Sequence, residues 1–170
     1  MFRTLAIAAA LSVAVARAAP VVTQRSGVWE NLEGTDNGSH PICAMGVEGD
    51  DRWILIKYTV GEPYLTFTLG KSGWNVVPHA KIKVELQVDS LDPWIATATA
   101  TDRRDILFTI QAKQIAQFLT EVSDGANMRI SFVEERENDW RASLDGSDDI
   151  ARSFGNCVSR ITHGNQGDYE

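Results

Sequence analysis

The residues that could carry chemistry are scattered along the chain, and most lack the spacing that chemistry needs. The three histidines, His40, His79 and His163, lie in predicted loops or in the tail, and none has a second histidine at helical or hairpin spacing. A zinc site needs several such ligands to converge, so no metal site is predicted. The nucleophile-elbow sequence G-x-S-x-G is also absent. A Ser-His-Asp arrangement of distant residues stays open, but no catalytic residue and no cofactor-binding residue is predicted.

Four acidic residues fall close together in 134–139, and paired carboxylates are the groups that cleave glycosidic bonds. They are Glu134, Glu135, Glu137 and Asp139. Glycoside hydrolysis needs two carboxyl groups across a cleft, one of them with its pKa raised by an apolar pocket. A charged loop between two strands offers no such pocket. We therefore predict that 134–139 is a solvated hairpin tip without catalytic function.

The short sequence Gly70-Lys71-Ser72 resembles the end of a phosphate-binding loop. The complete motif has another glycine five residues before Gly70, where this chain has Leu65. It also opens a helix whose amide groups bind the phosphate, and no helical pattern follows Ser72. The segment is therefore predicted to be a hairpin turn from Gly70 to Gly73.

Five tryptophans could stack on sugar rings or anchor a partner protein, although aromatic residues in strands usually pack in a core. They are Trp29, Trp53, Trp74, Trp94 and Trp140. Trp53 lies opposite the strand face that carries Ile54 and Ile56, and Trp74 follows the glycine-rich turn. We predict that Trp53 and Trp74 are the tryptophans exposed for contact with a partner, whereas Trp140 belongs to the core.

The two cysteines, Cys43 and Cys157, are too far apart in sequence for the close spacing of redox pairs and zinc sites. In an oxidising compartment an even pair of cysteines indicates a disulfide. We therefore predict a disulfide between Cys43 and Cys157, and two buried free thiols are the alternative.

The N-terminal residues have the order of a secretory signal peptide over 1–18. Arg3 supplies a positive charge, 5–16 is almost entirely apolar or small, and Ala16 and Ala18 have the spacing that a signal peptidase recognises. The apolar run is shorter than the roughly 20 residues of a spanning helix. We predict cleavage near Ala18, no transmembrane segment after cleavage, and a periplasmic or secreted location.

The charge of the mature chain limits its partners. Loss of residues 1–18 removes two of the 16 basic residues and none of the 23 acidic ones, which leaves a formal charge of −9. Proteins that bind nucleic acid usually present a basic patch, and anionic lipid attracts cations, so we expect neither as a partner. The length suits one domain with a core, which we place at 19–162, followed by a flexible polar tail at 163–170.

Most of the mature chain alternates between apolar and polar residues, which is typical of strands with one buried face. The clearest example is 81–88, where four aliphatic residues alternate with charged or amide residues. Short loops between such segments favour antiparallel pairing. The alternating segments are 52–60, 64–69, 81–88, 94–101, 106–110, 128–132 and 140–144. Residues 19–41 are predicted to be an irregular lead-in with a short strand around Val28 and Trp29.

Two segments, 111–123 and 147–161, have the period of amphipathic helices. Their apolar faces carry Ile115, Phe118, Leu119 and Val122 in the first, and Ile150, Phe154, Cys157, Val158 and Ile161 in the second. Ser147 is a predicted N-cap. Cys157 faces the core, where Cys43 on an early strand can meet it. The predicted fold is α+β: a mainly antiparallel sheet of about seven to eight strands, meander or sandwich-like, with these two helices.

The end of this pattern resembles the invasion-associated locus B proteins, which are small bacterial periplasmic proteins. The residues that carry the resemblance are Trp140, Leu144, Gly146, Ser147, Ile150, Phe154 and Cys157. The signal peptide and an early cysteine agree with it, although those proteins usually carry more than two cysteines. The resemblance implies a Gram-negative envelope setting and no established enzymatic activity, and it carries over no catalytic residue.

Three functions are compatible with the sequence. We favour a non-enzymatic periplasmic protein that binds an envelope or secreted protein partner or a small ligand. The second is an inhibitor or immunity-type protein that blocks an enzyme with a loop such as 70–77 or 134–139. The third is a hydrolase with a site built from scattered residues. A deep pocket lined by histidines and carboxylates would favour the hydrolase, and a protruding loop beside an exposed tryptophan would favour the inhibitor.

Overall fold

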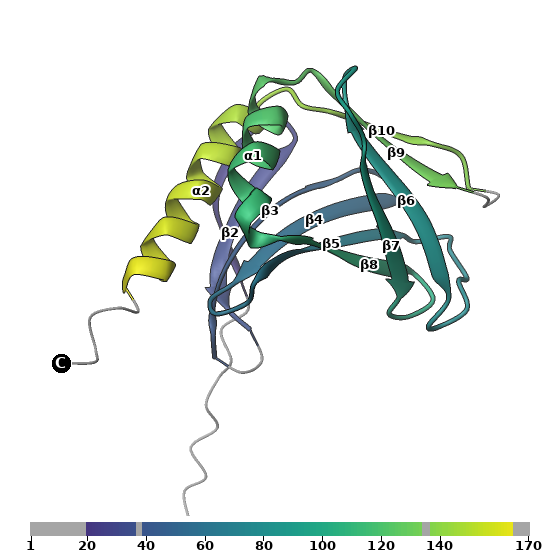
Figure 1. The fold of residues 1–170 in the computed structure, drawn as a ribbon, viewed down its shortest axis with the longest axis horizontal. Helices are drawn as coiled ribbons and strands as arrows, with labels where there is room; N and C mark the ends of the chain where they lie inside the picture. The colour runs from purple at the N-terminus through teal and green to yellow at the C-terminus, as the bar shows by residue number, and fades with distance from the viewer. Residues whose placement is uncertain (1–19, 37–38, 134–136, 165–170) are drawn as a thin grey trace, which may run out of the picture.

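A computed structural model describes residues 20–36, 39–133 and 137–164 (Figure 1). They form one strongly curved antiparallel sheet with two helices packed side by side, of which the C-terminal one lies against the N-terminal strands. The predicted signal peptide at 1–18 and residues 165–170 of the predicted tail lie outside the described residues. No helix in the described part of the chain is long and apolar enough to cross a membrane.

Ten strands make up the sheet. They are β1 Val21–Ser26, β2 Trp29–Thr35, β3 Pro41–Glu48, β4 Arg52–Thr59, β5 Tyr64–Lys71, β6 Lys81–Val88, β7 Trp94–Ala100, β8 Asp105–Gln111, β9 Asn127–Val133 and β10 Trp140–Ser143. Their order in the sheet is β1-β2-β3-β4-β5-β8-β7-β6-β9-β10. A 3-10 turn, Ala112–Gln114, and helix α1, Ile115–Asp124, follow β8, and helix α2, Ser147–Gly164, follows β10. The predicted α+β class with a mainly antiparallel sheet is confirmed, with more strands than expected.

The additional strands lie in 19–41, where the prediction of an irregular lead-in is wrong. β1 and β2 form a hairpin, and β2 pairs with β3 over its full length. Their alternation is hidden because Val21 at the start of β1 is exposed, whereas the polar Asn31 is buried. The Asn31 amide donates to the Thr23 hydroxyl at 2.8 Å, so its burial is partly compensated by a hydrogen bond.

The helix boundaries also differ from the prediction. The alternation of β8 continues to Gln111, so α1 begins only at Ile115. The Ser147 hydroxyl does not act as the predicted cap, because it is buried and donates to the Val122 carbonyl of α1 at 2.7 Å. Helix α2 ends at Gly164, within the first residues of the predicted tail.

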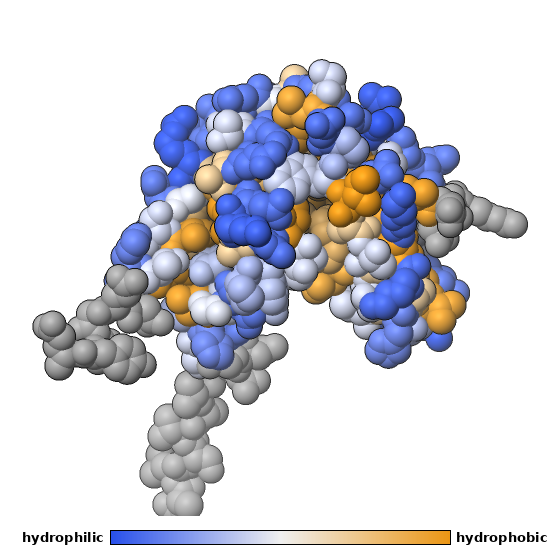
Figure 2. All heavy atoms as spheres, in the orientation of Figure 1, coloured by the Kyte–Doolittle hydropathy of each residue, from blue (hydrophilic) through white to orange (hydrophobic). Residues whose placement is uncertain are grey.

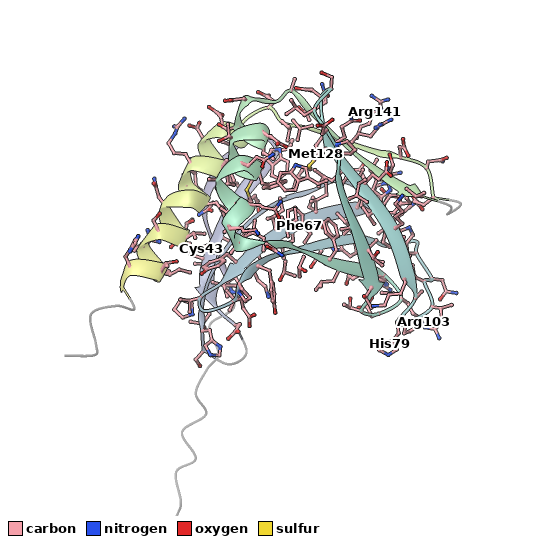
Figure 3. The ribbon with its side chains drawn as sticks, viewed as in Figure 1. Cys43, Phe67, His79, Arg103, Met128 and Arg141 are labelled. Atoms are coloured by element: carbon pink, nitrogen blue, oxygen red, sulfur yellow. A yellow bond between two sulfur atoms is a disulfide. The ribbon has the colours of Figure 1, made fainter. Side chains whose placement is uncertain are left out.

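The sheet divides into two halves between β7 and β8. These strands pair only at Thr99–Leu107 and Ala100–Ile106, and beyond these pairs they diverge (Figure 1). Phe118 of α1 fills the space between the halves, with its ring centroid 5.1 Å from that of Phe67 and 5.9 Å from that of Trp94. Burial of such a ring contributes about 1.5–3 kcal/mol. Figure 3 shows Phe67 on the inner face of the arch.

The last helix is fixed to the sheet by a covalent bond. Helix α2 packs across β1, β2 and β3, and the structure joins Cys43 of β3 to Cys157 of α2 in a disulfide with a Cα–Cα distance of 5.9 Å. The predicted pairing is therefore confirmed. By the chain-entropy model, closure of a loop of this length contributes about 4–5 kcal/mol to stability.

The two ends of the sheet approach each other beside α2. The Trp29 indole on β2 donates to the Ser143 carbonyl on β10 at 2.9 Å. Gly27 and Gly146 have positive φ angles of 56° and 82°, and a Cβ atom on Gly27 would lie 2.3 Å from the Asp145 carbonyl oxygen. Only glycine fits at these two contacts, which hold β10 close to the first hairpin.

Candidate ligand-binding site

The candidate site begins with two cations on the inner face of the sheet. Arg52 and Lys71 are paired neighbours at the ends of β4 and β5, and they follow the alternation of the buried residues Ile54 and Leu69. Both cations therefore lie where an apolar core would otherwise continue. The Lys71 side chain is only 22% exposed and needs a partner, because removal from water disfavours an unpaired charge. The Arg52 side chain keeps 42% of its surface exposed.

The β5–β6 loop, residues 72–80, covers this end of the sheet and is anchored to the turn between β7 and β8. The amide of Val76 donates to the Arg103 carbonyl at 3.0 Å, and the amide of His79 donates to the Ala100 carbonyl at 2.9 Å. Figure 3 shows His79 and Arg103 together at this tip of the molecule. The loop is thus held by backbone hydrogen bonds, and it carries Trp74 to the inner side.

Glu137 connects these elements through one carboxylate. It accepts hydrogen bonds from the Lys71 ammonium at 2.9 and 3.2 Å, from the Trp74 indole at 2.8 Å and from the Trp140 indole at 2.9 Å. Its side chain is only 18% exposed. The carboxylate therefore joins β5, the β5–β6 loop and β10, three elements that are far apart in sequence.

Aromatic rings surround this carboxylate. The ring centroids of Trp74 and Trp140 are 5.2 Å apart, and Phe132 makes edge contacts with Trp74 and Trp140 at 5.7 and 5.1 Å. The Arg52 guanidinium lies 5.5 Å from the Trp140 ring centroid, within cation–π range. We call Arg52, Lys71, Trp74, Glu137 and Trp140 the inner cluster.

The surroundings of Glu137 favour its ionised form. Burial by itself would raise its pKa, but the hydrogen bonds from Trp140, Trp74 and Lys71, together with the Lys71 charge, outweigh burial and lower the pKa overall. A carboxylate has about four acceptor positions, and the four contacts described above use them. Glu137 is therefore an ionised, saturated acceptor and cannot serve as a general acid at neutral pH.

A pocket of about 390 Å³ lies beside the inner cluster. Trp74, Phe132 and Glu137 form one part of its lining, and Val76, Ala80 and Ile82 are among the other residues that line it. Figure 2 shows apolar surface to the right of the helices, in the region of the second half of the sheet. The pocket thus combines a largely apolar lining with an ionised carboxylate whose charge is compensated by Lys71.

Glu137 overturns part of the prediction for 134–139. Asn138 and Asp139 are exposed, as a solvated hairpin tip requires, but the side chain of Glu137 is mostly buried. Residues 134–136 lie outside the described residues. The pattern of charges did not reveal the difference, because the partners of Glu137 at Lys71 and Trp74 are more than sixty positions away. Only Trp140, three residues later, is a local signal.

The structure separates the two tryptophans predicted to contact a partner. Trp74 belongs to the inner cluster, whereas Trp53 lies on the outer face of the sheet, where its indole donates to Asp105 at 2.9 Å. The Trp53 ring lies over Gly70, where a Cβ atom would be 1.9 Å from the ring. Both side chains are half-buried rather than fully exposed, and their contact with a partner stays a prediction.

The histidines lie on three separate elements. His40, in the β2–β3 loop, is 3.3 Å from Asp36, His79 is in the β5–β6 loop, and His163 is near the end of α2. All three are exposed. Within residues 20–36, 39–133 and 137–164, no group of three or more histidine, cysteine or acidic residues could hold a metal ion.

Comparisons with known proteins give a structural likeness but no family. No protein-family model and no curated protein matches the chain. Among solved structures, the fold is similar to the crystal structure of invasion associated protein B from Bartonella henselae, with a TM-score of 0.46 and 14% sequence identity. The alignment covers 86% of this chain and 99% of that chain. These comparisons assign the chain to no family.

Proposed function

We propose that this chain is an exported, non-enzymatic binding protein whose pocket beside the inner cluster holds the apolar group of a small envelope ligand. The observation that carries the proposal is the saturation of Glu137. Three donor groups occupy its carboxylate. The described lining of the pocket is therefore mainly apolar and holds no free catalytic acid or base. Binding sites for small molecules are largely apolar, with volumes of about 300–1,000 Å³, and this pocket lies in that range.

Export is supported by the disulfide and by the sequence of residues 1–18. Disulfides persist in oxidising compartments and are rare in the cytosol, and Cys43 and Cys157 are bonded here. N-terminal sequencing of the exported form should give a chain that starts at Ala19 or close to it. A chain that starts at Met1 would contradict the export proposal and leave the pocket proposal untouched.

The two alternative functions have weaker support. An inhibitor that acts through 70–77 needs a free loop, but the Trp74 indole is bound to Glu137 and the amide of Val76 is bound to the Arg103 carbonyl. A hydrolase needs a nucleophile or a base with a free acceptor in a cleft. The described lining of the pocket includes no histidine, and its single carboxylate is saturated.

A neutral apolar dye tests the proposal directly. We expect N-phenyl-1-naphthylamine to bind the mature protein with one saturable site, a rise in dye fluorescence and quenching of tryptophan emission. Ala80→Phe should fill the pocket and abolish binding, because Ala80 lines it. Trp53→Phe is the matched control, since Trp53 lies on the outer face, and its dye affinity should equal that of the unchanged protein.

The fold of each variant is checked by its thermal unfolding midpoint. A folded Ala80→Phe variant that still binds the dye with unchanged affinity would refute the pocket. Loss of dye binding in Trp53→Phe would show that the dye binds on the outer face, which would also refute the proposed pocket. Turnover in a screen of ester, amide and glycoside substrates would overturn the non-enzymatic assignment.

A further inference from the structure

A second candidate site lies on the outer face of β9 and β10, away from the pocket beside the inner cluster. Arg129 of β9 and Arg141 of β10 are directly opposite each other in the antiparallel register. Their neighbours Met128 and Ile130 point to the core and are buried, so both arginines lie on the outer face. Like charges that face each other across two strands destabilise the pair, and a bound anion would remove this repulsion.

The two guanidinium groups differ in how they are held. Arg129 donates to the Gln87 side-chain oxygen at 2.7 Å and lies 3.8 Å from an Asp139 carboxylate oxygen. Gln87 in turn donates to the Leu91 carbonyl at 2.8 Å, so Arg129 is oriented by a fixed partner. Within the described residues, the Arg141 side chain has no hydrogen bond or ion pair. Figure 3 shows Arg141 at the outside of the molecule.

A hollow of about 550 Å³ lies between these arginines and the turn after β6. Besides the arginines, its lining includes Gln87, Asp89, Ser90 and Asn127. Asp89 is the acidic residue that faces the hollow, and its two carboxylate oxygens accept the backbone amides of Ala126 and Asn127, each at 2.9 Å. Its charge is therefore directed to the start of β9. The Ser90 hydroxyl and the Asn127 side-chain amide make no hydrogen bond with the described residues.

We propose that this hollow binds a sugar that carries an oxyanion, either a phosphate or a carboxylate. Arg129 and Arg141 pair with the oxyanion, because guanidinium groups match the geometry of both anions and bind them with two parallel hydrogen bonds. Ser90 and Asn127 donate to or accept from the hydroxyl groups of the sugar. The volume of the hollow exceeds that of a bare anion, which is the reason for a ligand with additional hydroxyl groups.

The charge of the whole protein makes the arginine pair a local exception. The mature chain has a formal charge of −9, from 14 basic and 23 acidic residues, so the attraction of an anion must come from the two opposed arginines. Attraction between exposed charges is screened by salt, so affinity should fall as ionic strength rises. The site needs no step of the function proposed above, and each proposal can fail alone.

The test uses the mature protein with its disulfide intact. Glucose 6-phosphate, galacturonate, glucose and inorganic phosphate are titrated separately while the arginine side-chain signals are followed by NMR. We expect the two charged sugars to shift the Arg129 and Arg141 signals, with affinities at least about tenfold higher than those of glucose and inorganic phosphate, the difference that one charge-assisted contact provides. A preference for the phosphate or for the carboxylate identifies the source of the oxyanion, and either supports the site.

Arg141→Gln is the deciding variant, because the Arg141 side chain makes no hydrogen bond or ion pair with the described residues. It should weaken binding of the preferred charged sugar by about tenfold or more. Arg104→Gln is the matched control, since it removes the same charge from the β7–β8 turn at the other end of β7, and it should leave the affinity unchanged. Equal binding of inorganic phosphate and charged sugars, equal weakening by both variants, or no binding of any charged sugar would overturn the proposal.

Discussion

Two indole–carboxylate hydrogen bonds occupy opposite faces of the sheet at the ends of β4 and β5. On the inner face Trp74 donates to Glu137 at 2.8 Å, and on the outer face Trp53 donates to Asp105 at 2.9 Å. The two bonds are nearly equal in length. They differ in the number of other donors, because Glu137 also accepts from Lys71 and Trp140.

This difference reverses the effect on the two carboxyl groups. For Asp105, burial and then the charge of Asp102 raise the pKa, and the hydrogen bond from Trp53 does not compensate. For Glu137, burial acts in the same direction, but three donor groups and the Lys71 charge lower the pKa. One indole does not offset burial and the Asp102 charge at Asp105, whereas three donor groups and the Lys71 charge offset burial at Glu137. The inner cluster connects elements that are far apart in sequence. The outer pair, Trp53 and Asp105, places an indole ring over Gly70.

The disulfide lies apart from both indole–carboxylate pairs, and its loss is the largest expected change in the free energy of unfolding. We expect the double substitution Cys43→Ser and Cys157→Ser to lower the free energy of unfolding by about 4–5 kcal/mol, because it releases a loop of 114 residues in the unfolded chain. Urea unfolding of the mature protein and of the variant measures this. If this variant loses less unfolding free energy than the Glu137→Ala variant described next, the inner cluster stabilises the fold more than the disulfide does.

Substitution of Glu137 should cost more than substitution of Asp105. Glu137→Ala leaves the Lys71 ammonium and two indole N–H groups without their acceptor, so we expect a loss of about 2–4 kcal/mol. Asp105→Ala removes the acceptor of a single indole and should cost about 1 kcal/mol. Urea unfolding compares the two, and Glu137→Gln, which keeps the shape, should fall between them. Equal losses would show that the additional donors to Glu137 do not stabilise the fold.

Local patterns predicted the elements, and long-range contacts created the site. The alternation in 81–88 coincides with β6. The bond between Cys43 and Cys157 was predicted from an even pair of cysteines in an exported chain, and the apolar stripe that places Cys157 on the inner face of α2 agreed with it. Alternation also placed Trp53 opposite the buried face of β4. It could not place Trp74 or Glu137, because neither lies in a strand and their hydrogen bond joins two connecting segments. The buried Asn31 hid β2 for the same reason, since its partner Thr23 lies on another strand.

Gly70 tests the outer pair without touching either carboxylate. A Cβ atom there would lie 1.9 Å from the Trp53 ring, whereas a Cβ atom on Gly73 would meet nothing within 4 Å. Gly70→Val should therefore displace the indole, shift its fluorescence to longer wavelength and cost about 1–3 kcal/mol through overpacking. Gly73→Val is the control and should change neither quantity appreciably. A Gly70→Val variant with unchanged emission would mean that Trp53 does not cover this position.

The smallest effect is the pH dependence, and its sign differs between the two pairs. Because the pKa of Glu137 is lowered in the folded protein, the ionised group stabilises the fold above the ordinary glutamate pKa of about 4.3. That contribution is lost as the pH falls below this value, through the folded-state pKa. The pKa of Asp105 is raised, so its ionised form destabilises the fold, and this cost disappears as the pH falls through its folded-state pKa.

Free energies of unfolding measured from neutral pH to below pH 4 for the unchanged protein, Glu137→Gln and Asp105→Asn separate the two contributions. The stability advantage of the unchanged protein over Glu137→Gln should shrink as the pH falls, because protonation abolishes the charge that Lys71 and the indoles stabilise. Relative to Asp105→Asn, the unchanged protein should instead gain stability over the same range. If the two differences in unfolding free energy changed in the same direction as the pH fell, the environments of Glu137 and Asp105 would not act in opposite directions on stability.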